Sequence, residues 1–340
     1  MNIITGLQAT GNLHIGNYFG AILPMIEKTK QIQSTDKLYL FVPDLHSLTI
    51  DIDYSTFYQN ILNNVRVYLA CGLPQSQDNI TVFRQSFVPA HSQIQWLLSC
   101  FSYFGEMSRM TQFKDKSKDH ESNINLGLFS YPILMAGDIL LYDALYVPIG
   151  EDQVQHLELC RDLAIRINNK FNKQIFVIPK NTGEQMEFIG YEKALRIRSL
   201  SNPEKKMSKS SPDEKSKIML TDEPAKAIKK IMSATTDSLE NICWNWETQP
   251  GITNLLQLFS ILSGKSKEQT ILEWSDQKQY GPLKKAVAEL ISEFLTEFQT
   301  NLAKISNQDV VKALTKGEIQ ANLQANHTLL RFQKSLGLHK

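Results

Sequence analysis

The sequence predicts an α/β protein in which a parallel, doubly wound sheet is followed by an all-helical domain. Two observations carry this prediction. Apolar, β-rich runs alternate with helical patterns through the first half of the chain, and strand signals fade after Pro212. Alternation of this kind places helices between successive parallel strands. Ligands of such sheets bind at the carboxyl ends of the strands, where the strand order reverses.

The strand candidates of the first half are short runs of branched and aromatic side chains, at 1–7, 38–42, 80–83, 144–148 and 175–178. Apolar residues at helical spacing fill the intervals 16–30, 57–71 and 153–171. A further helix is expected to begin at Pro132, because proline suits the first helical position. The segment 180–198 is the least regular, and we expect it to include a surface excursion.

The second half is predicted to be helical from Glu223 onward. One apolar face comprises Ala286, Leu290, Ile291, Phe294, Phe298 and Leu302, which is the spacing of an amphipathic helix. We therefore divide the chain into an α/β domain at 1–214, a helical domain at 215–300 and C-terminal helices at 301–340. Packing of these last helices back on the first domain is one alternative.

Composition and charge are those of an ordinary globular protein. The 340 residues suffice for a well-buried core, and hydrophobic and charged residues make up 42% and 21%. No apolar run approaches the roughly 20 residues of a membrane span. The N-terminus lacks the basic and apolar regions of a signal peptide. We therefore expect a cytoplasmic protein that makes no membrane contact.

A net charge of +1 gives no global attraction to nucleic acid, so such a partner would need local basic patches. The candidate patches are Lys226, Lys229 and Lys230, then Lys265 and Lys267, then Lys284 and Lys285. For each patch alone, a solvated helix face is the more common explanation.

The four cysteines, Cys71, Cys100, Cys160 and Cys243, are widely spaced and form no CxxC motif. Zinc sites in proteins need closer ligand spacing than this. We interpret the cysteines as buried or inert thiols in a reducing compartment.

Two short motifs, far apart in the sequence, indicate that the protein binds a polyphosphate. The first, Gly11-Asn12-Leu13-His14-Ile15-Gly16-Asn17, follows a strand candidate and leads into a helix. Its glycines let a nucleotide approach the backbone, and a helix N-terminus offers unpaired N–H groups to phosphate. The second, Lys206-Met207-Ser208-Lys209-Ser210, is a basic loop whose ammonium groups suit a polyphosphate. Each motif is weak alone, and their order along the chain predicts ATP chemistry.

The two motifs resemble the HIGH and KMSKS signatures of class I aminoacyl-tRNA synthetases. Three further stretches, 110–114, 131–138 and 150–153, narrow the resemblance to the tryptophanyl-tRNA synthetases of the bacterial type. The resemblance runs from Gly6 through Gly251 and continues more weakly to the C-terminus. It implies a Rossmann-like catalytic domain that activates L-tryptophan with ATP. The same enzyme would transfer the aminoacyl group to the 3′ end of tRNA(Trp), releasing pyrophosphate and AMP.

By position, the resemblance also implies the residues of the ATP site. Those that would contact ATP are Gln8, Ala9, Thr10, His14, Gly16, Asn17, Gly150, Glu151, Asp152, Ile197, Lys206, Met207, Ser208, Lys209 and Ser210. Catalytic roles fall to Lys206, Lys209, Lys116 and Gln8. No protein nucleophile is needed, because the carboxylate of tryptophan attacks the α-phosphate and the protein aligns the reactants and neutralises charge. For His14, the alternative is a capping or packing role. For Glu151 and Asp152, the alternative is that they stabilise a helix N-terminus as first-turn acidic residues.

The stretch 131–138 is expected to determine which amino acid binds. Tyr131, Met135 and Asp138 fall at i, i+4 and i+7 and therefore share one helix face. A carboxylate beyond an apolar face suits a flat ligand that carries one N–H. The resemblance accordingly assigns the indole N–H of tryptophan to Asp138, a bond that rejects analogues lacking the N–H by roughly 10⁴-fold. It adds to the tryptophan pocket His46, Ile4, Val147, Ile149 and Gln153; for the first four, core packing is an equal alternative.

Cofactors and partners follow from the same resemblance. It implies ATP with Mg²⁺ and neither zinc nor an iron–sulfur cluster. Its partners would be tRNA(Trp), L-tryptophan, ATP and a second copy of the chain in a homodimer, with the helical domain reading the anticodon. The alternatives are a tyrosyl-tRNA synthetase, a small nucleotidyltransferase that uses no tRNA, and a non-catalytic paralogue.

Overall fold

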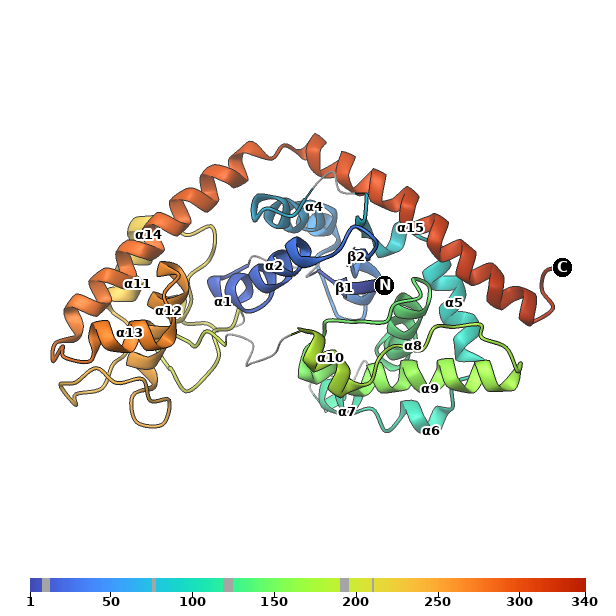
Figure 1. Cartoon of the computed structure of the whole chain (residues 1–340), viewed down its shortest axis with the longest axis horizontal. Helices are drawn as coiled ribbons and strands as arrows, with labels where there is room; N and C mark the ends of the chain where they lie inside the picture. Colours follow the sequence, from blue (N-terminus) through green and yellow to red (C-terminus); the bar gives the residue numbers. More distant parts are fainter. Residues whose placement is uncertain (8–12, 75–77, 119–124, 190–195, 210) are drawn as a thin grey trace.

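A small parallel sheet lies at the centre of the computed structural model, which describes residues 1–7, 13–74, 78–118, 125–189, 196–209 and 211–340 (Figure 1). Its strand order is β1 (Asn2–Gly6), β2 (Lys37–Val42) and β3 (Ile80–Arg84). The register pairs Ile4 with Tyr39 and Leu40 with Val82. The predicted strands at 1–7, 38–42 and 80–83 are thereby confirmed.

A further segment extends the sheet beside β1, on the edge opposite β2. Ile3 and Tyr146 form a parallel bridge, and the Ile4 N–H donates to the Tyr146 carbonyl at 3.0 Å. The chain order across the sheet therefore reverses at β1, as it does in a doubly wound sheet. The predicted strand 144–148 is reduced to this one bridge. The carboxyl ends of β1 and of this segment border the crevice in which ligands of such sheets bind.

The prediction of a strand at 175–178 is wrong. Asn168 satisfies the backbone there: its Oδ1 accepts from the N–H groups of Ile175 and Phe176, both at 2.9 Å, and its Nδ2 donates to the Phe176 carbonyl at 2.8 Å. These backbone groups need no neighbouring strand, because a side chain already pairs them. The apolar pattern reflects burial, since both side chains lie in the core.

Two hydrophobic cores lie on opposite faces of the sheet. Ile3 and Leu40 point into one core, and Ile4 and Tyr39 point into the other, as the alternation of side chains along a strand requires. The helices of this first part of the chain are α1 (Ile15–Asn17), α2 (Leu23–Gln31), α3 (Asp44–Ser47), α4 (Tyr54–Ala70), α5 (Ala90–Ser99), α6 (Phe104–Met107), α7 (Thr111–Lys118), α8 (Leu126–Leu140), α9 (Val154–Lys170) and α10 (Thr182–Ile189). Short 3₁₀ turns are η2 (Gln85–Phe87), η3 (Glu151–Gln153) and η4 (Glu214–Ser216).

The helices predicted at 57–71 and 153–171 are confirmed as α4 and α9. The helix predicted at 16–30 is present but contains a π-helical turn, η1 (Tyr18–Ile22), between α1 and α2. Pro24 has no N–H to donate to the Gly20 carbonyl, which explains the wider turn. Part of the segment 180–198, predicted as irregular, forms α10.

α8 corrects the prediction that a helix begins at Pro132. Its N-cap is Asn125, whose Oδ1 accepts from the Leu128 N–H at 2.8 Å, and Pro132 lies inside the helix. A capping asparagine before an apolar run thus outweighs the preference of proline for a first turn. Tyr131, Met135 and Asp138 still share a face, because the whole stretch is helical.

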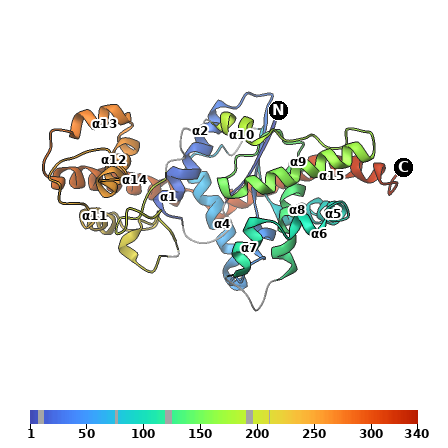
Figure 2. The ribbon, with the colours of Figure 1, turned by 90° about the horizontal axis from the view of Figure 1, so that it is seen from below.

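The C-terminal part is helical, as predicted, and comprises α11 (Pro224–Met232), α12 (Pro250–Ser263), α13 (Lys267–Trp274), α14 (Tyr280–Lys304) and α15 (Asn307–Ser335). Figure 2 shows α11–α14 gathered to one side of the sheet, with α1 nearest to them. α14 meets η1 through aromatic rings: the Phe294 centroid lies 4.8 Å from that of Tyr18 and 5.3 Å from that of Phe19.

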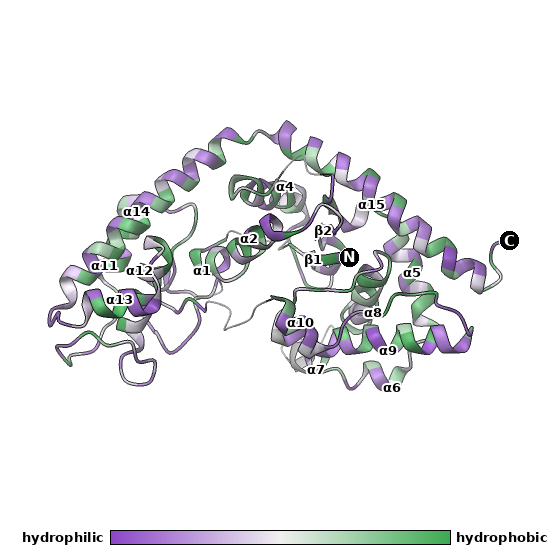
Figure 3. Ribbon diagram, in the orientation of Figure 1, coloured by the Kyte–Doolittle hydropathy of each residue, from purple (hydrophilic) through white to green (hydrophobic). Residues whose placement is uncertain are grey.

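α15 leaves this bundle and packs along β3, α4 and α5 (Figure 1). Hydrophobic and hydrophilic residues alternate along α14 and α15, as expected for helices with one buried side (Figure 3). Gly317 is required at the contact, because a Cβ there would lie 1.9 Å from the Val82 carbonyl oxygen. A buried bidentate pair, Arg84 with Glu318 at 2.6 and 3.0 Å, fixes the helix on the sheet. Within the described ranges, no helix has the length and apolar content that crossing a bilayer demands.

All four cysteines are free thiols, and only part of the expectation about their burial is confirmed. Cys160 is buried and Cys71 half-buried, whereas Cys100 and Cys243 are exposed. Burial raises the pKa of the Cys71 thiol to about 12, so this thiol is unreactive at neutral pH.

Candidate active site

The two sequence motifs meet because the chain that follows the second motif pairs with the first. The Ile15 N–H donates to the Ile218 carbonyl at 3.0 Å, and the Leu220 N–H donates to the Leu13 carbonyl at 2.9 Å. This short antiparallel pairing holds the start of α1 against the segment that carries the second motif. Two stretches from opposite ends of the catalytic part of the sequence thus form one site.

His14 and Asn17 cap α1 reciprocally. The His14 Nδ1 accepts from the Asn17 N–H at 3.2 Å, and the Asn17 Oδ1 accepts from the His14 N–H at 3.1 Å. The capping role considered for His14 is therefore real. Because Nδ1 accepts a hydrogen bond, a neutral His14 carries its proton on Nε2, which leaves that nitrogen a donor. Burial, with the charges of Lys209 and Lys217, lowers the pKa of His14 to about 4.

The second motif begins on one arm of a short hairpin, where Arg198 and Lys206 form an antiparallel bridge, and the chain at its end is bonded to Lys217. The Met207 N–H donates to the Ile197 carbonyl at 3.0 Å. The buried Lys217 Nζ donates to the carbonyls of Lys209 and Ser211 at 2.9 and 2.8 Å and lies 3.2 Å from a Glu214 carboxylate oxygen. Three bonds use all three N–H groups of an ammonium. Lys217 therefore fixes the backbone of this basic loop.

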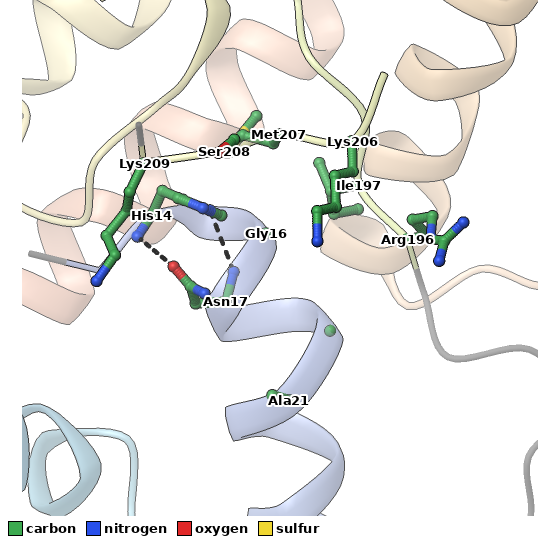
Figure 4. A pocket seen from close by; sticks show the side chains of 11 residues that line it. His14, Gly16, Asn17, Ala21, Arg196, Ile197, Lys206, Met207, Ser208 and Lys209 are labelled. Atoms are coloured by element: carbon green, nitrogen blue, oxygen red, sulfur yellow. Dashed lines mark hydrogen bonds between the residues drawn. The ribbon is translucent and has the colours of Figure 1, made fainter. Parts of the chain in front are cut away.

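The two motifs line one cavity of about 520 Å³ (Figure 4). Its described lining comprises His14, Gly16, Asn17, Gly20, Ala21, Arg196, Ile197, Lys206, Met207, Ser208 and Lys209. Burial lowers the pKa of Lys209, which indicates an ammonium placed where an anion would be favourable. The positive lining and the volume suit a nucleotide with its phosphates.

Glycine at position 16 does more than let a nucleotide approach the backbone, because it also leaves room for the His14 ring. A Cβ at this position would lie 2.9 Å from two atoms of the His14 ring and 3.5 Å from the Met207 Cβ. A side chain would therefore first displace the ring that caps α1. Glycine allows His14, α1 and the second motif to pack together.

Asp138 lies outside this cavity, at the buried centre of a second cluster whose outer member, His46, is half-buried. Its Oδ1 accepts from Gln85 Nε2 at 2.7 Å and from His91 Nδ1 at 2.6 Å, and its Oδ2 accepts from His46 Nε2 at 2.7 Å. The His91 Nε2 lies 2.9 Å from the Tyr142 hydroxyl. Burial alone would raise the pKa of Asp138, but the His46 charge and the hydrogen bonds from His46 and His91 lower it to about 2. The carboxylate is therefore ionised at neutral pH.

Tyr131 and Gln153 are joined by a histidine that the sequence analysis missed. His156 Nδ1 donates to the Gln153 Oε1 at 2.8 Å, and its Nε2 lies 3.3 Å from the Tyr131 hydroxyl. The Gln153 Nε2 in turn donates to Asp152 Oδ2 at 2.7 Å. Burial and the Asp152 charge raise the pKa of Tyr131 to about 12. This chain connects helix α8 with η3, so two predicted stretches lie beside each other.

The other residues predicted for the tryptophan pocket are core residues or border the core. Ile4 and Val147 are buried, whereas Met135 and His46 are half-buried. Ile149 packs against the same core, and the ring centroids of His46 and Tyr131 lie 6.0 Å apart. A Cβ on Gly150 would lie 2.7 Å from Asp152 Oδ1, so glycine lets that carboxylate turn back over the loop.

Several predicted residues cannot be placed in either cluster. Gln8, Ala9, Thr10 and Ser210 lie outside the described residues. Lys116 lies on α7 and Glu151 in η3. Conversely, the structure adds Arg196 and Lys217 to the cavity region and Gln85, His91, Tyr142 and His156 to the buried clusters. Only Arg196 carried a usable signal, as a cation next to the predicted Ile197.

The chain matches a family model described as class I tRNA synthetases (W and Y) over residues 1–296. It is 43% identical over 336 residues to the tryptophan–tRNA ligase of Caldanaerobacter subterraneus subsp. tengcongensis, covering 99% of this chain and 98% of that protein. The tryptophan–tRNA ligase of Bacillus subtilis is 41% identical over 337 residues, covering 99% and 97%.

Solved structures agree with these relatives. Tryptophanyl-tRNA synthetase from Mycoplasma pneumoniae superimposes with a TM-score of 0.81 and 37% identity, covering 99% of this chain and 98% of that one. The enzyme from Campylobacter jejuni, solved with ADP and tryptophan, gives a TM-score of 0.79 at 28% identity, covering 99% and 100%. Similarity therefore extends over the whole length of both chains.

Proposed function

The chain belongs to the class I tRNA synthetases for tryptophan and tyrosine, and from this premise we propose how it divides its chemistry between the cavity and the Asp138 cluster. It is a tryptophan–tRNA ligase with a Rossmann-like α/β fold and a helical C-terminal part. It activates L-tryptophan with ATP to tryptophanyl-adenylate and then charges tRNA(Trp), releasing pyrophosphate and AMP. The observation that carries this function is the meeting of both signature motifs at one cationic cavity.

The cavity binds ATP and stabilises the charge of the departing pyrophosphate. His14 donates from Nε2 to a phosphate oxygen, while Gly16 and Asn17 present the N-terminus of α1. Lys206 and Lys209 neutralise the pyrophosphate, with Ile197, Met207, Ser208 and Ser210 completing the loop. Gln8, Ala9 and Thr10, which precede the first motif in sequence, and Lys116 of α7 also contact ATP, and Gly150, Glu151 and Asp152 bind its ribose.

Mg²⁺ enters this site with ATP as part of the substrate. The described lining residues offer ammonium, guanidinium, imidazole and amide groups but no carboxylate, and Mg²⁺ prefers carboxylate and phosphate oxygens. The phosphates of ATP are therefore its natural ligands here, and the ion offsets their charge. We propose no zinc or iron–sulfur cluster for this chain.

The Asp138 cluster selects tryptophan. Asp138 accepts the indole N–H, and Tyr131, Met135, His46, Ile4, Val147 and Gln153 surround the ring and the amino-acid backbone. The support is chemical: a buried carboxylate whose pKa is about 2 stays ionised and can only accept hydrogen bonds. A phenol hydroxyl, which also needs an acceptor, differs from indole in the position of its hydrogen, so tyrosine would leave the site poorly matched.

The helical domain at 215–300 binds the anticodon of tRNA(Trp), while 1–214 is catalytic and 301–340 packs on the catalytic part. One predicted tRNA patch needs correction. Lys230 is buried, with its Nζ 2.6 Å from Asp222 Oδ2 and 2.8 Å from the Lys217 carbonyl. Its ammonium therefore stabilises the fold and cannot meet a phosphate, which leaves the exposed Lys226 and Lys229 as candidates on α11.

We propose that the enzyme works as a cytoplasmic homodimer. Trp96, Phe104 and Leu126 are exposed, although they sit on α5, α6 and α8, which pack together. Exposed aromatic side chains of this size suit burial against a second copy. Trp96→Glu should convert the dimer to monomers in size-exclusion chromatography with light scattering. A wild-type chain that elutes only as a monomer would contradict the proposal.

The function is tested by ATP–pyrophosphate exchange with tryptophan and tyrosine side by side, followed by aminoacylation of tRNA(Trp). We expect exchange and charging with tryptophan alone. Exchange driven by tyrosine would overturn the specificity, and exchange without charging would indicate a nucleotidyltransferase. No exchange with either amino acid would indicate a non-catalytic paralogue.

A further inference from the structure

The two oxygens of Asp138 have different surroundings. Oδ1 accepts two hydrogen bonds, from Gln85 Nε2 and His91 Nδ1, and both donors are buried with 0% exposure. Oδ2 accepts one, from His46, whose side chain is 19% exposed. A carboxylate oxygen has two lone pairs. Within the described part of the chain, Oδ1 is therefore saturated, and Oδ2 keeps one lone pair on the side of the half-buried histidine.

The donor to Oδ1 is itself held by a tyrosine. Because the ionised Asp138 can only accept, His91 carries its proton on Nδ1, and a neutral ring then accepts from the Tyr142 hydroxyl at Nε2. Tyr142 is buried, with its ring 4.6 Å from that of Tyr39 and 5.2 Å from that of Phe83. A hydrogen-bonded chain thus runs from Tyr142 through His91 to Asp138 in a fixed direction.

Gln85 holds its orientation at a cost. Its amide nitrogen donates to Asp138, but its Oε1 is buried and has no hydrogen-bond partner among the described residues. A buried acceptor without a partner destabilises the folded state. The Gln85 side chain thus donates to Asp138 Oδ1 even though its own carbonyl oxygen stays unpaired. We infer that this donor has a function beyond stability.

We propose that Gln85 and His91, which saturate Oδ1, and Tyr142, which holds His91, are positioning residues that present Oδ2 to the indole N–H. The torsion that turns a carboxylate is soft, so without donors on one oxygen the group could rotate toward other partners. Held in place, it cannot compensate when a ligand lacks the N–H. Discrimination by an unpaired buried acceptor depends on such rigidity. This inference rests on the proposed role of Asp138.

The test compares L-tryptophan with benzothienylalanine, an analogue of nearly the same shape in which sulfur replaces the indole N–H. The readout is the ratio of their kcat/KM values in ATP–pyrophosphate exchange, roughly 10⁴ for the wild-type enzyme. Loss of one bond to a charged group lowers such a ratio about 10- to 100-fold. We expect His91→Leu to lower the ratio by a factor within this range and Tyr142→Phe to lower it by about 10-fold. In both variants the KM for tryptophan should rise, and that for the analogue should not change.

Two further variants separate positioning from folding. His91→Asn places an amide N–H near the original Nδ1 and should restore the ratio to within about threefold of wild type. Tyr39→Phe removes a hydroxyl from the buried ring packed against Tyr142 and should leave the ratio unchanged. Should His91→Leu fail to fold, Tyr142→Phe, which removes a single oxygen atom, still decides the question.

Asp138→Asn separates the role of Asp138 in binding the indole from the positioning role of Gln85, His91 and Tyr142. If this variant collapses the ratio while His91→Leu and Tyr142→Phe keep it within threefold of wild type, Asp138 recognises the indole and the positioning role is overturned. If Asp138→Asn also keeps the wild-type ratio, the assignment of Asp138 fails and the positioning role falls with it.

Discussion

The cationic cavity and the Asp138 cluster, to which we assign nucleotide binding and tryptophan recognition, are built in opposite ways. The cavity is an open space of about 520 Å³ lined by long cationic side chains on a loop. In the cluster, Asp138 is fully buried among residues of α3, η2, α5 and α8, and only His46 is partly exposed. Flexible lysine side chains can stabilise the negative charge that develops on a departing pyrophosphate. Recognition of a single neutral N–H needs an acceptor that cannot move.

The largest effect that separates the two regions is expected from Lys209→Ala. Removal of this ammonium should slow adenylate formation about 10²- to 10³-fold, because one stabilising charge is lost in the transition state. The affinity for tryptophan should stay within about twofold of wild type. Single-turnover kinetics and calorimetry measure the two quantities. Lys215→Ala, at an exposed lysine of the same segment, is the control, and an equal loss of rate and affinity in Lys209→Ala would contradict the division.

Asp138→Ala should weaken tryptophan binding and leave ATP binding intact, the reverse of the effect expected for Lys209→Ala. Three donors lose their acceptor, so the free energy of unfolding should fall by about 3 kcal/mol, and tryptophan should bind about 10- to 100-fold more weakly. The affinity for ATP should be unchanged. Denaturant melts and calorimetry test both statements, and an unaltered dissociation constant for tryptophan would remove Asp138 from the pocket.

Lys217→Met asks whether the loop of the cavity must be held in place. The variant keeps most of the buried stem but removes the bonds to the carbonyls of Lys209 and Ser211. Loss of this clamp should slow adenylate formation about 10-fold, since about 1.4 kcal/mol of positioning is lost. Glu214→Gln, which alters only the exposed partner of Lys217, is the matched control. A wild-type rate in Lys217→Met would show that the loop needs no anchor.

The smallest expected effect is the dependence of stability on pH that comes from His14. Its pKa of about 4 lies below the ordinary 6.5, so the unfolded chain binds the proton more readily than the native one. The contribution of His14 to stability is therefore complete above pH 6.5 and is lost as the pH falls toward 4. Imidazole NMR should find a midpoint near 4, and Lys209→Ala should raise it. A midpoint near 6.5 would contradict the buried, cation-flanked environment.

The sheet and the nucleotide motifs were predictable because their signals are local. The short runs of branched and aromatic residues in β1–β3 and the motifs near His14 and Lys209 each lie within a few consecutive residues. The predictions that were wrong depend on contacts between residues or on burial, which the local sequence does not show. Asn168 replaces a neighbouring strand at 175–178, Asn125 moves the start of α8 ahead of Pro132, and burial turns Lys230 into a core residue.

The Asp138 cluster shows where sequence reasoning stops. Gln85 and His91 lie 53 and 47 residues from Asp138 in sequence, and each sits at a position where polar residues are ordinary. Nothing local distinguishes a donor to a buried carboxylate from a surface glutamine or a helix-capping histidine. The roles of individual residues in both regions, and the domain boundaries, remain predictions for experiment.

A double-mutant cycle between Lys209→Ala and Asp138→Ala tests the division of labour most directly. The measured quantity is kcat/KM for tryptophan in ATP–pyrophosphate exchange, with the folding of each variant checked by circular dichroism. If the two regions act independently, the free-energy costs of the single changes add to within about 0.5 kcal/mol in the double variant. A coupling of about 1 kcal/mol or more would show that charge stabilisation and indole recognition are one function, and the account would be wrong.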